Sequence, residues 1–159
     1  MKKFISILFT MFVVFSVHAQ SADVITDILN TEQVTFGQVC YISAVEQGLL
    51  DNKDDYNKAI EVMAANELIP EIMDANTPIP AVNISFIMSQ IWNIRGGLMY
   101  KITKGSPRYS FKQFKSDGVI NRNVEPQDYI AGIDLLEMYN VCSRIYGGFD
   151  ISSVSMELE

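Results

Sequence analysis

The chain has 159 residues and carries nineteen acidic against twelve basic side chains, one histidine and two cysteines. Hydrophobic residues make up 48% of it, which is enough for a packed core and excludes general disorder. The net charge of −7 argues against a nucleic-acid partner, because phosphate binding needs clustered cations in excess.

The first nineteen residues have the pattern of a secretory signal. Lys2 and Lys3 precede an apolar run over residues 4–17, and Val17 and Ala19 occupy the positions that a signal peptidase reads. The run is short for a membrane span, and no stop-transfer flank follows it. We therefore expect cleavage after Ala19, export to the periplasm or cell surface, and a single mature domain that is not an integral membrane protein.

Cleavage at this site would remove His18, the sole histidine. A mature chain without imidazole excludes Ser/His/Asp and Cys/His nucleophile systems and histidine-ligated metals. Two cysteines cannot complete a cysteine-rich zinc site. The mature charge would be −9, with ten basic against nineteen acidic residues. We expect a protein that is not an enzyme and holds no metal or cofactor.

Cys40 and Cys142 leave two alternatives open. An oxidising compartment would permit a disulfide that closes a loop of about a hundred residues and ties the first long helix to the last. The other alternative is a pair of buried free thiols that behave as small apolar residues.

Apolar residues recur at helical spacing, which predicts an all-α domain of about five helices over residues 29–146. The best-marked helix begins at Thr35, which is spaced from Gln38 as in a capping box, and ends at Gly48 before Leu49. Four further helix stops of this style are expected at Asn66-Glu67, Gly97, Gly118 and Asn140.

Two more long helices are expected to begin at Asn83 or Ser85 and at Pro126, with Asp128 in the first turn of the latter. Short helices are expected over about 56–66 and 110–116.

The order of long helix, turn, short helix and linker predicts stacked helix-turn-helix repeats. Residues 20–28 would form a lead-in to this domain. Residues 147–159 alternate apolar and polar side chains and would form either a short edge strand or a loose tail.

These units resemble S-layer-homology-type repeats, in which a Thr-Arg-Ala-Glu-like capping box opens a helix and Gly-Leu or Gly-Ile-Ile turns end one. The resemblance covers about Leu29 to Cys142. The matching starts are Thr35 to Gln38, Ser85 to Met88 and Glu125 to Asp128, and the matching ends are Gly48-Leu49, Gly97-Leu98 and Gly118-Val119-Ile120.

The resemblance implies three helical hairpins around a pseudo-threefold axis and noncovalent attachment to a cell-wall polymer. In that family an arginine after the capping residue helps to hold an anionic glycan. Here that arginine is replaced by Phe36, Phe86 and Pro126.

Residues 95–122 carry seven cations and one acid, a local charge of +6, whereas residues 20–94 sum to −9 and residues 123–159 to −6. Arg and Lys in such a segment would pair with carboxylate or phosphate groups, and aromatic rings would stack on sugars or meet a partner surface. The candidate binding residues are Trp92, Arg95, Tyr100, Lys101, Lys104, Arg108, Tyr109, Lys112 and Lys115.

Two other interpretations of this segment stay open. Trp92, Phe111 and Phe114 would be core residues, with the cations forming a solvated face paired with acidic neighbours. Alternatively, the basic segment of one copy would meet the acidic ends of another, and such self-association would weaken with salt.

The acidic motifs point less clearly to chemistry. A calcium loop counted from Asp51 would need Gly at Tyr56 and Glu at Val62, so it fails, and a capped helix start is favoured. Asp134 and Glu137 share a helix face, whereas a glycosidase needs two carboxylates across a cleft.

We therefore expect an exported, non-enzymatic cell-envelope protein that acts as a structural or protein-interaction module in a periplasmic assembly. Binding of an anionic cell-wall polymer or peptidoglycan is the alternative. Protein interaction is favoured over it because the polymer-binding arginines are missing. A small carboxylate-based hydrolase is a further alternative, which two convergent acids in a pocket would favour.

Overall fold

The computed structural model describes residues 23–50, 54–92, 94, 96–103 and 105–147. Within these ranges the regular structure is helical, which confirms the all-α prediction, and the expected signal and the tail beyond Gly147 lie outside them. A helix over residues 23–29, which the sequence did not indicate, precedes α2 (Phe36–Glu46), α3 (Tyr56–Ala65), α4 (Ala81–Ile91), α5 (Leu98–Ile102), α6 (Pro107–Asp117) and α7 (Gly132–Tyr146).

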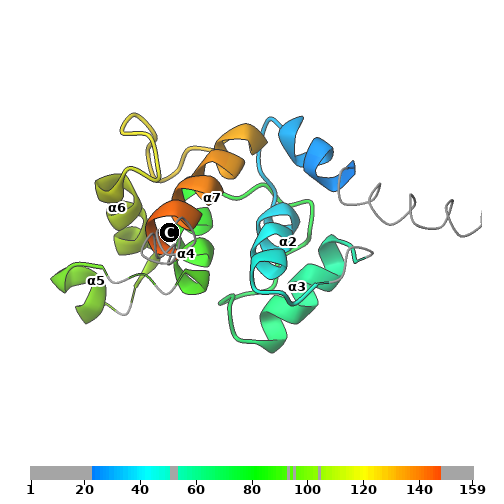
Figure 1. Ribbon diagram of the computed structural model, residues 1–159, viewed down its shortest axis with the longest axis horizontal. Coiled ribbons are helices and arrows are strands. Elements are labelled where there is room, and N and C mark those ends of the chain that lie inside the picture. Colours follow the sequence, from blue (N-terminus) through cyan, green and yellow to red (C-terminus); the bar gives the residue numbers. More distant parts are fainter. Residues whose placement is uncertain (1–22, 51–53, 93, 95, 104, 148–159) are drawn as a thin grey trace, which may run out of the picture.

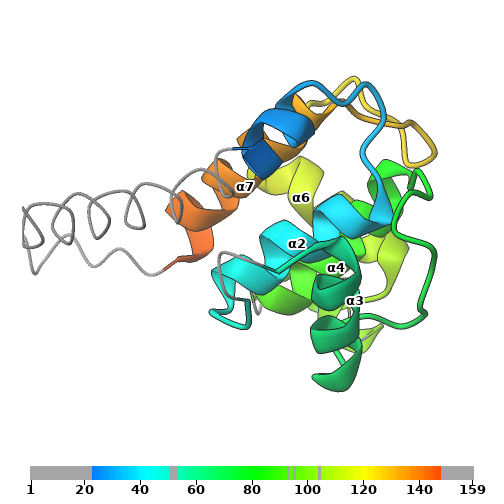
Figure 2. The same cartoon turned by 90° about the vertical axis from the view of Figure 1, so that its right-hand side faces the viewer.

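The helices pack in pairs around one core. α2 packs on α3, α4 packs on α6, and α2 also contacts α4. The beginning of α7 lies beside the 23–29 helix in both views (Figures 1 and 2), so the first and last described helices meet. Six of these helices each contribute a large, fully buried side chain to the core: Ile28, Phe36, Met63, Ile84, Phe114 and Leu135.

Three predicted helix ends are confirmed, with the expected chemistry. The backbone turns left-handed at Gly48 (φ +65°), Glu67 (φ +56°) and Gly118 (φ +75°). After each turn the next apolar residue donates its N–H back into the helix, as in a Schellman motif: Leu49 to Ala44 O (2.9 Å), Leu68 to Met63 O (3.0 Å) and Val119 to Phe114 O (2.9 Å).

The start of α2 is also confirmed as a capping box. The Thr35 hydroxyl accepts the Gln38 N–H at 3.4 Å, and the Gln38 side-chain oxygen accepts the Thr35 N–H at 3.1 Å. This pair satisfies two backbone donors that the first turn leaves without an intrahelical partner.

Two predicted helix starts are wrong. α4 begins at Ala81 rather than at Asn83 or Ser85, and Ser85 is buried inside the helix, where its hydroxyl donates to the Ala81 carbonyl at 2.6 Å. α7 begins at Gly132 rather than at Pro126, so Asp128 lies in the preceding loop.

Two predicted helix ends are wrong as well. α7 continues through Asn140 to Tyr146. Gly97 does not end a helix but forms the N-cap of α5, a short helix that the sequence did not indicate.

The physical reason for the shifted starts is a ring of backbone hydrogen bonds, the capping ring. The loop before α4 caps α2, the loop before α7 caps α4, and the loop before α2 caps α7. These bonds satisfy N–H groups that a helix start leaves without a partner, so α4 begins at Ala81 although no side chain caps it. They run from Phe36 N to Thr77 O (2.8 Å), Gly37 N to Ala75 O (2.9 Å), Ala81 N to Asp128 O (2.8 Å), Val82 N to Pro126 O (3.0 Å) and Gly132 N to Thr31 O (2.9 Å).

Three buried apolar residues lie inside this ring, each two positions before a long helix: Val34, Ile79 and Ile130. The Val34 N–H donates to the Ile130 carbonyl at 2.9 Å, and the Ile79 N–H donates to the Val34 carbonyl at 3.1 Å. Glycine is needed at Gly132 because a Cβ there would lie 1.6 Å from the Ile28 carbonyl oxygen.

The segments α3–α4 and α6–α7 correspond position by position at a constant shift of 51 residues. The shift takes Ala81, which begins α4, to Gly132, which begins α7. It also takes left-handed Glu67 to left-handed Gly118. The buried residues Ile60, Met63 and Ile79 correspond to the buried residues Phe111, Phe114 and Ile130.

Cys40 and Cys142 are both buried free thiols, so the disulfide alternative does not describe them. Burial raises the pKa of each thiol to about 12, and the charge of Asp117 adds to the effect at Cys142. The two thiols therefore stay protonated and act as small apolar core residues.

Three tyrosine–carboxylate hydrogen bonds tie the helices together at the surface of the core. The Tyr56 hydroxyl of α3 donates to the Asp27 carboxylate at 2.6 Å. Two tyrosines of α7 do the same: Tyr139 donates to Glu46 at the end of α2, and Tyr146 donates to Asp117 at the end of α6. Burial, and then the carboxylate, raise the pKa of all three phenols.

We predict that these bonds make the protein lose stability in alkali. A phenol whose pKa is raised on folding stabilises the fold fully below its unfolded pKa of about 10, and this contribution is lost as the pH rises further. The free energy of unfolding in urea, measured at about pH 8 and about pH 11, should fall more steeply for the natural protein than for Y56F/Y139F/Y146F. Equal slopes would contradict the prediction.

Candidate functional site

One face of α6 carries three cations, which we call the basic stripe: Arg108, Lys112 and Lys115. Their spacing of four and three residues places them along one side of the helix. Phe111 and Phe114 are buried, which confirms the interpretation of these rings as core residues. α6 is therefore an amphipathic helix whose outer side concentrates positive charge.

The basic stripe lines a groove of about 440 Å³. The opposite wall comes from Val82 at the start of α4 and from Glu125, Pro126 and Gln127 in the loop before α7. Because the Pro126 carbonyl accepts the Val82 N–H at 3.0 Å, the capping ring fixes this wall in place. We call this site the α6 groove.

Few of the charges on the basic stripe are neutralised. Lys115 Nζ lies 3.7 Å from the Glu125 carboxylate, whose side chain is 72% exposed. The other stripe cations have no carboxylate within ion-pair distance among the described residues. Lys112 and Lys115 also lie over aromatic rings: Lys112 Nζ is 5.6 Å from the Tyr109 centroid, and Lys115 Nζ is 5.5 Å from the Phe111 centroid. The interpretation of the cations as paired with acidic neighbours therefore fits Lys115 alone.

The fold does not require cations at these positions. The shift of 51 residues relates the basic stripe to Asn57, Glu61 and Ala64 on α3. One helix thus has a neutral or acidic face where the other has a cationic face, although both bury equivalent core residues. The positive charge of α6 is a property of this surface and not of helix packing.

The structure does not gather all the predicted residues at the α6 groove. Tyr109 is half-buried on α6 next to Lys112, and Lys101 is exposed on α5. Trp92 instead packs edge-on against Tyr139 of α7, with ring centroids 5.8 Å apart. Arg95 and Lys104 lie outside the described residues.

Tyr100 is also used for packing. Its ring covers Gly96 and Gly105, where an added Cβ would lie 2.3 Å and 2.7 Å from it. Sequence reasoning missed the opposite wall of the groove because it assigned Glu125 to Asp128 to a helix start, and no local signal identifies this loop as a wall.

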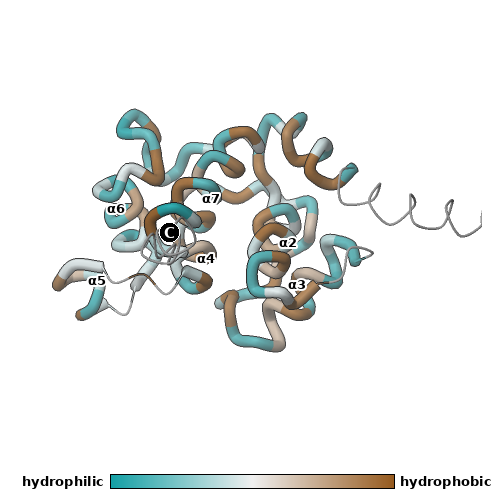
Figure 3. The backbone as a smooth tube through the Cα atoms, in the orientation of Figure 1, coloured by the Kyte–Doolittle hydropathy of each residue, from teal (hydrophilic) through white to brown (hydrophobic). Residues whose placement is uncertain are grey.

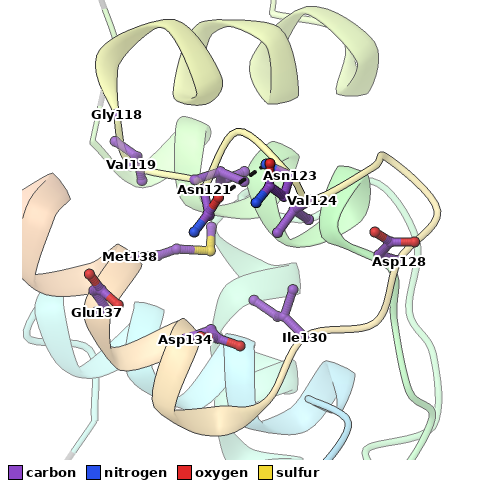
Figure 4. A pocket seen from close by; sticks show the side chains of 11 residues that line it. Gly118, Val119, Asn121, Asn123, Val124, Asp128, Ile130, Asp134, Glu137 and Met138 are labelled. Atoms are coloured by element: carbon purple, nitrogen blue, oxygen red, sulfur yellow. Dashed lines mark hydrogen bonds between the residues drawn. The ribbon is translucent and has the colours of Figure 1, made fainter.

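A second pocket, of about 540 Å³, lies between the loop after α6 and the first turns of α7 (Figure 4). Asp128, Asp134 and Glu137 line it, and Figure 4 shows their carboxylates spread around the rim. The Asp128 carboxylate accepts the Glu125 N–H at 2.8 Å, and that of Asp134 accepts the Ala131 N–H at 3.3 Å. Two of the three acids, Asp128 and Asp134, therefore accept backbone N–H groups of their own turns.

The acidic stretch before α3 forms a helix cap. The Asp55 carboxylate accepts the Lys58 N–H at 2.8 Å, which confirms a capped helix start there, and residues 51–53 lie outside the described ranges. No three His, Cys, Asp or Glu side chains of the described residues are grouped so as to hold a metal ion. No helix among these residues is long and apolar enough to cross a bilayer.

Comparisons with known proteins give no family for this chain: no family model matches it, and neither does any curated protein.

We predict that the basic stripe is dispensable for folding. R108Q/K112Q/K115Q loses one ion pair at the surface and two cation–π contacts, so the free energy of unfolding in urea should change by less than about 2 kcal/mol. F114A, on the same helix, should cost about 3–5 kcal/mol because it opens a cavity in the core. A loss above about 2 kcal/mol in the triple variant would show that the stripe is structural.

Proposed function

We propose that this protein is an exported, non-enzymatic module of the cell envelope that binds another protein through the α6 groove. The observation that carries the proposal is the basic stripe: three cations beside a groove, largely without carboxylate partners, at positions where the fold accepts Asn, Glu and Ala. Such a surface is complementary to an acidic segment of a partner and would steer its approach.

We also propose that the domain consists of three equivalent units around an approximate threefold axis. Each unit would be a short helix, a loop and a long helix: residues 23–29 with α2, α3 with α4, and α6 with α7. The cyclic order of the capping ring supports this arrangement. The shift of 51 residues supports the arrangement for the second and third units. The same shift relates two pockets, one of about 250 Å³ and the one in Figure 4. It takes the lining residues Ile79, Asn83, Phe86 and Ile87 to Ile130, Asp134, Glu137 and Met138.

A protein partner accounts for the groove better than a cell-wall polymer does. The groove wall opposite the stripe is Val82, Glu125, Pro126 and Gln127, which mixes apolar, acidic and amide groups as protein interfaces do. Of the rings expected to stack on sugars, Trp92 and Tyr100 pack against neighbouring residues instead. Binding of an anionic polymer remains the second candidate, because the stripe itself would hold carboxylate or phosphate groups equally well.

The proposal predicts a selective loss of capture when the stripe is neutralised. Tagged protein is incubated with solubilised envelope fractions and, separately, with sedimented peptidoglycan. R108Q/K112Q/K115Q should retain less than about a tenth of the captured partner, because each desolvated charge contact contributes about 1–3 kcal/mol. The matched control K58Q/R122Q/R144Q removes the same charge from outside the groove and should capture normally.

The comparison separates three outcomes. Loss of a protein band in the stripe variant alone supports the proposal, whereas loss of peptidoglycan sedimentation alone supports the polymer. Equal capture by both variants would contradict a role for the α6 groove.

A further inference from the structure

The short helix α5 presents three large aliphatic side chains to solvent. Leu98, Met99 and Ile102 are 71%, 54% and 64% exposed, and they are three of the most exposed large hydrophobic residues among those described. A rotation of about 100° per residue places them within one arc of about 100°, with Tyr100 on the other side of the helix. Figure 3 shows α5 at the edge of the molecule, with hydrophobic and hydrophilic residues close together along it.

The fold holds α5 firmly with this face turned outward. The Tyr100 ring packs over Gly96 and Gly105, and the Gly97 N–H donates to the Gln113 side chain of α6 at 3.1 Å. The aliphatic face is therefore the side of α5 that does not take part in these contacts.

The helix pairing does not need α5. The connection from α4 to α6 runs from residue 92 to residue 106 and contains this helix, whereas the connection from α2 to α3 runs only from residue 47 to residue 55. Both connections join two helices that pack against each other. The α4–α6 connection is therefore longer than the α2–α3 connection because it contains α5.

We infer that α5 is a shallow membrane anchor that inserts Leu98, Met99 and Ile102 into the interfacial layer of an anionic bilayer. An exposed aliphatic face flanked by cations is the pattern of elements that lie in this layer. Lys101, which is exposed on α5 itself, supplies a cation beside this face, and α5 packs on α6, the helix that carries the basic stripe. Such cations attract anionic headgroups.

A lipid surface fits this face better than a protein pocket does. Protein hot spots are enriched in Trp, Tyr and Arg and depleted in Leu, whereas the exposed face of α5 is entirely aliphatic. A bilayer also needs no complementary pocket to receive this face. The one aromatic ring of α5, that of Tyr100, is turned inward to fix the helix.

The distribution of charge agrees with this orientation. α5 and α6 lie at one end of the molecule, and α2 and α3, with acidic residues such as Glu46 and Glu61, lie at the other (Figure 1). With α5 on the bilayer, the acidic end points away from the headgroups. Salt screens the repulsion between the acidic end and the anionic headgroups, because the Debye length is about 8 Å under physiological conditions.

The test is sedimentation of the naturally processed protein with vesicles. Vesicles of equal parts phosphatidylglycerol and phosphatidylcholine are compared with pure phosphatidylcholine vesicles. The natural protein should sediment with the anionic vesicles, less so when salt is raised from about 0.05 to about 0.5 M. L98S/M99S/I102S should lower the partition coefficient at least about tenfold, because it removes the apolar area that enters the bilayer.

The matched control is V45S/I72S/I133S, which alters three exposed apolar residues elsewhere and should bind as the natural protein does. Failure of the natural protein to sediment with anionic vesicles would overturn the inference, as would an equal loss in the control. A change of oligomeric state in the α5 variant without any vesicle binding would assign this face to a second copy instead. The α5 variant should still capture the protein partner of the α6 groove, so this inference and the proposed function fail separately.

Discussion

The capping ring is the constraint on which the rest of the structure depends. The starts of α2, α4 and α7 are linked to one another through the loops that precede these helices. The start of an α-helix leaves several N–H groups without intrahelical partners. Burying those groups unpaired would cost about 1–3 kcal/mol for each. Loops from elsewhere in the chain supply their carbonyl oxygens instead, as Thr77 does for Phe36 and Asp128 does for Ala81. Helix starts, loop paths and the wall of the α6 groove are therefore fixed by one set of bonds.

This constraint acts on the backbone and on buried positions, and it leaves the outer faces free to differ. Met63 and Phe114 are equivalent and both fully buried, whereas the equivalent outer residues Glu61 and Lys112 have opposite charges. An apolar interior with a bonded backbone supplies the stability, and the surface composition can be set by function. The basic stripe and the aliphatic face of α5 are two such surfaces.

Local signals in the sequence predicted the parts of the fold that depend on local chemistry. The capping box at Thr35 and the left-handed stops at Gly48 and Gly118 involve residues within one or two turns of each other, so their spacing suffices. The starts of α4 and α7 could not be found in this way, because their caps come from loops that are about 45 residues distant in the chain for α4 and about 100 for α7. The sequence has local helix-start motifs at Ser85 and Pro126, but the tertiary bonds place the helix starts at Ala81 and Gly132 instead.

The candidate site was predictable to a similar extent. Charge counting located the cationic segment over residues 95–122, and the structure then singled out the basic stripe of α6 within it. The opposite wall of the groove was not predictable, because Glu125, Pro126 and Gln127 reach the stripe only through the path of a loop. The aromatic rings were assigned to the binding site because they are close to the cations in the sequence. Trp92 shows why this assignment fails, because its partner, Tyr139, belongs to α7.

Native-state hydrogen exchange tests the central claim most directly. First-turn amides of a helix ordinarily exchange fast, because they lack intrahelical acceptors. If the loops cap them, the amides of Phe36, Ala81 and Gly132 should be protected to nearly the same degree as the central amides of α2, α4 and α7. Rapid exchange at these three amides, with slow exchange in the helix centres, would contradict the account.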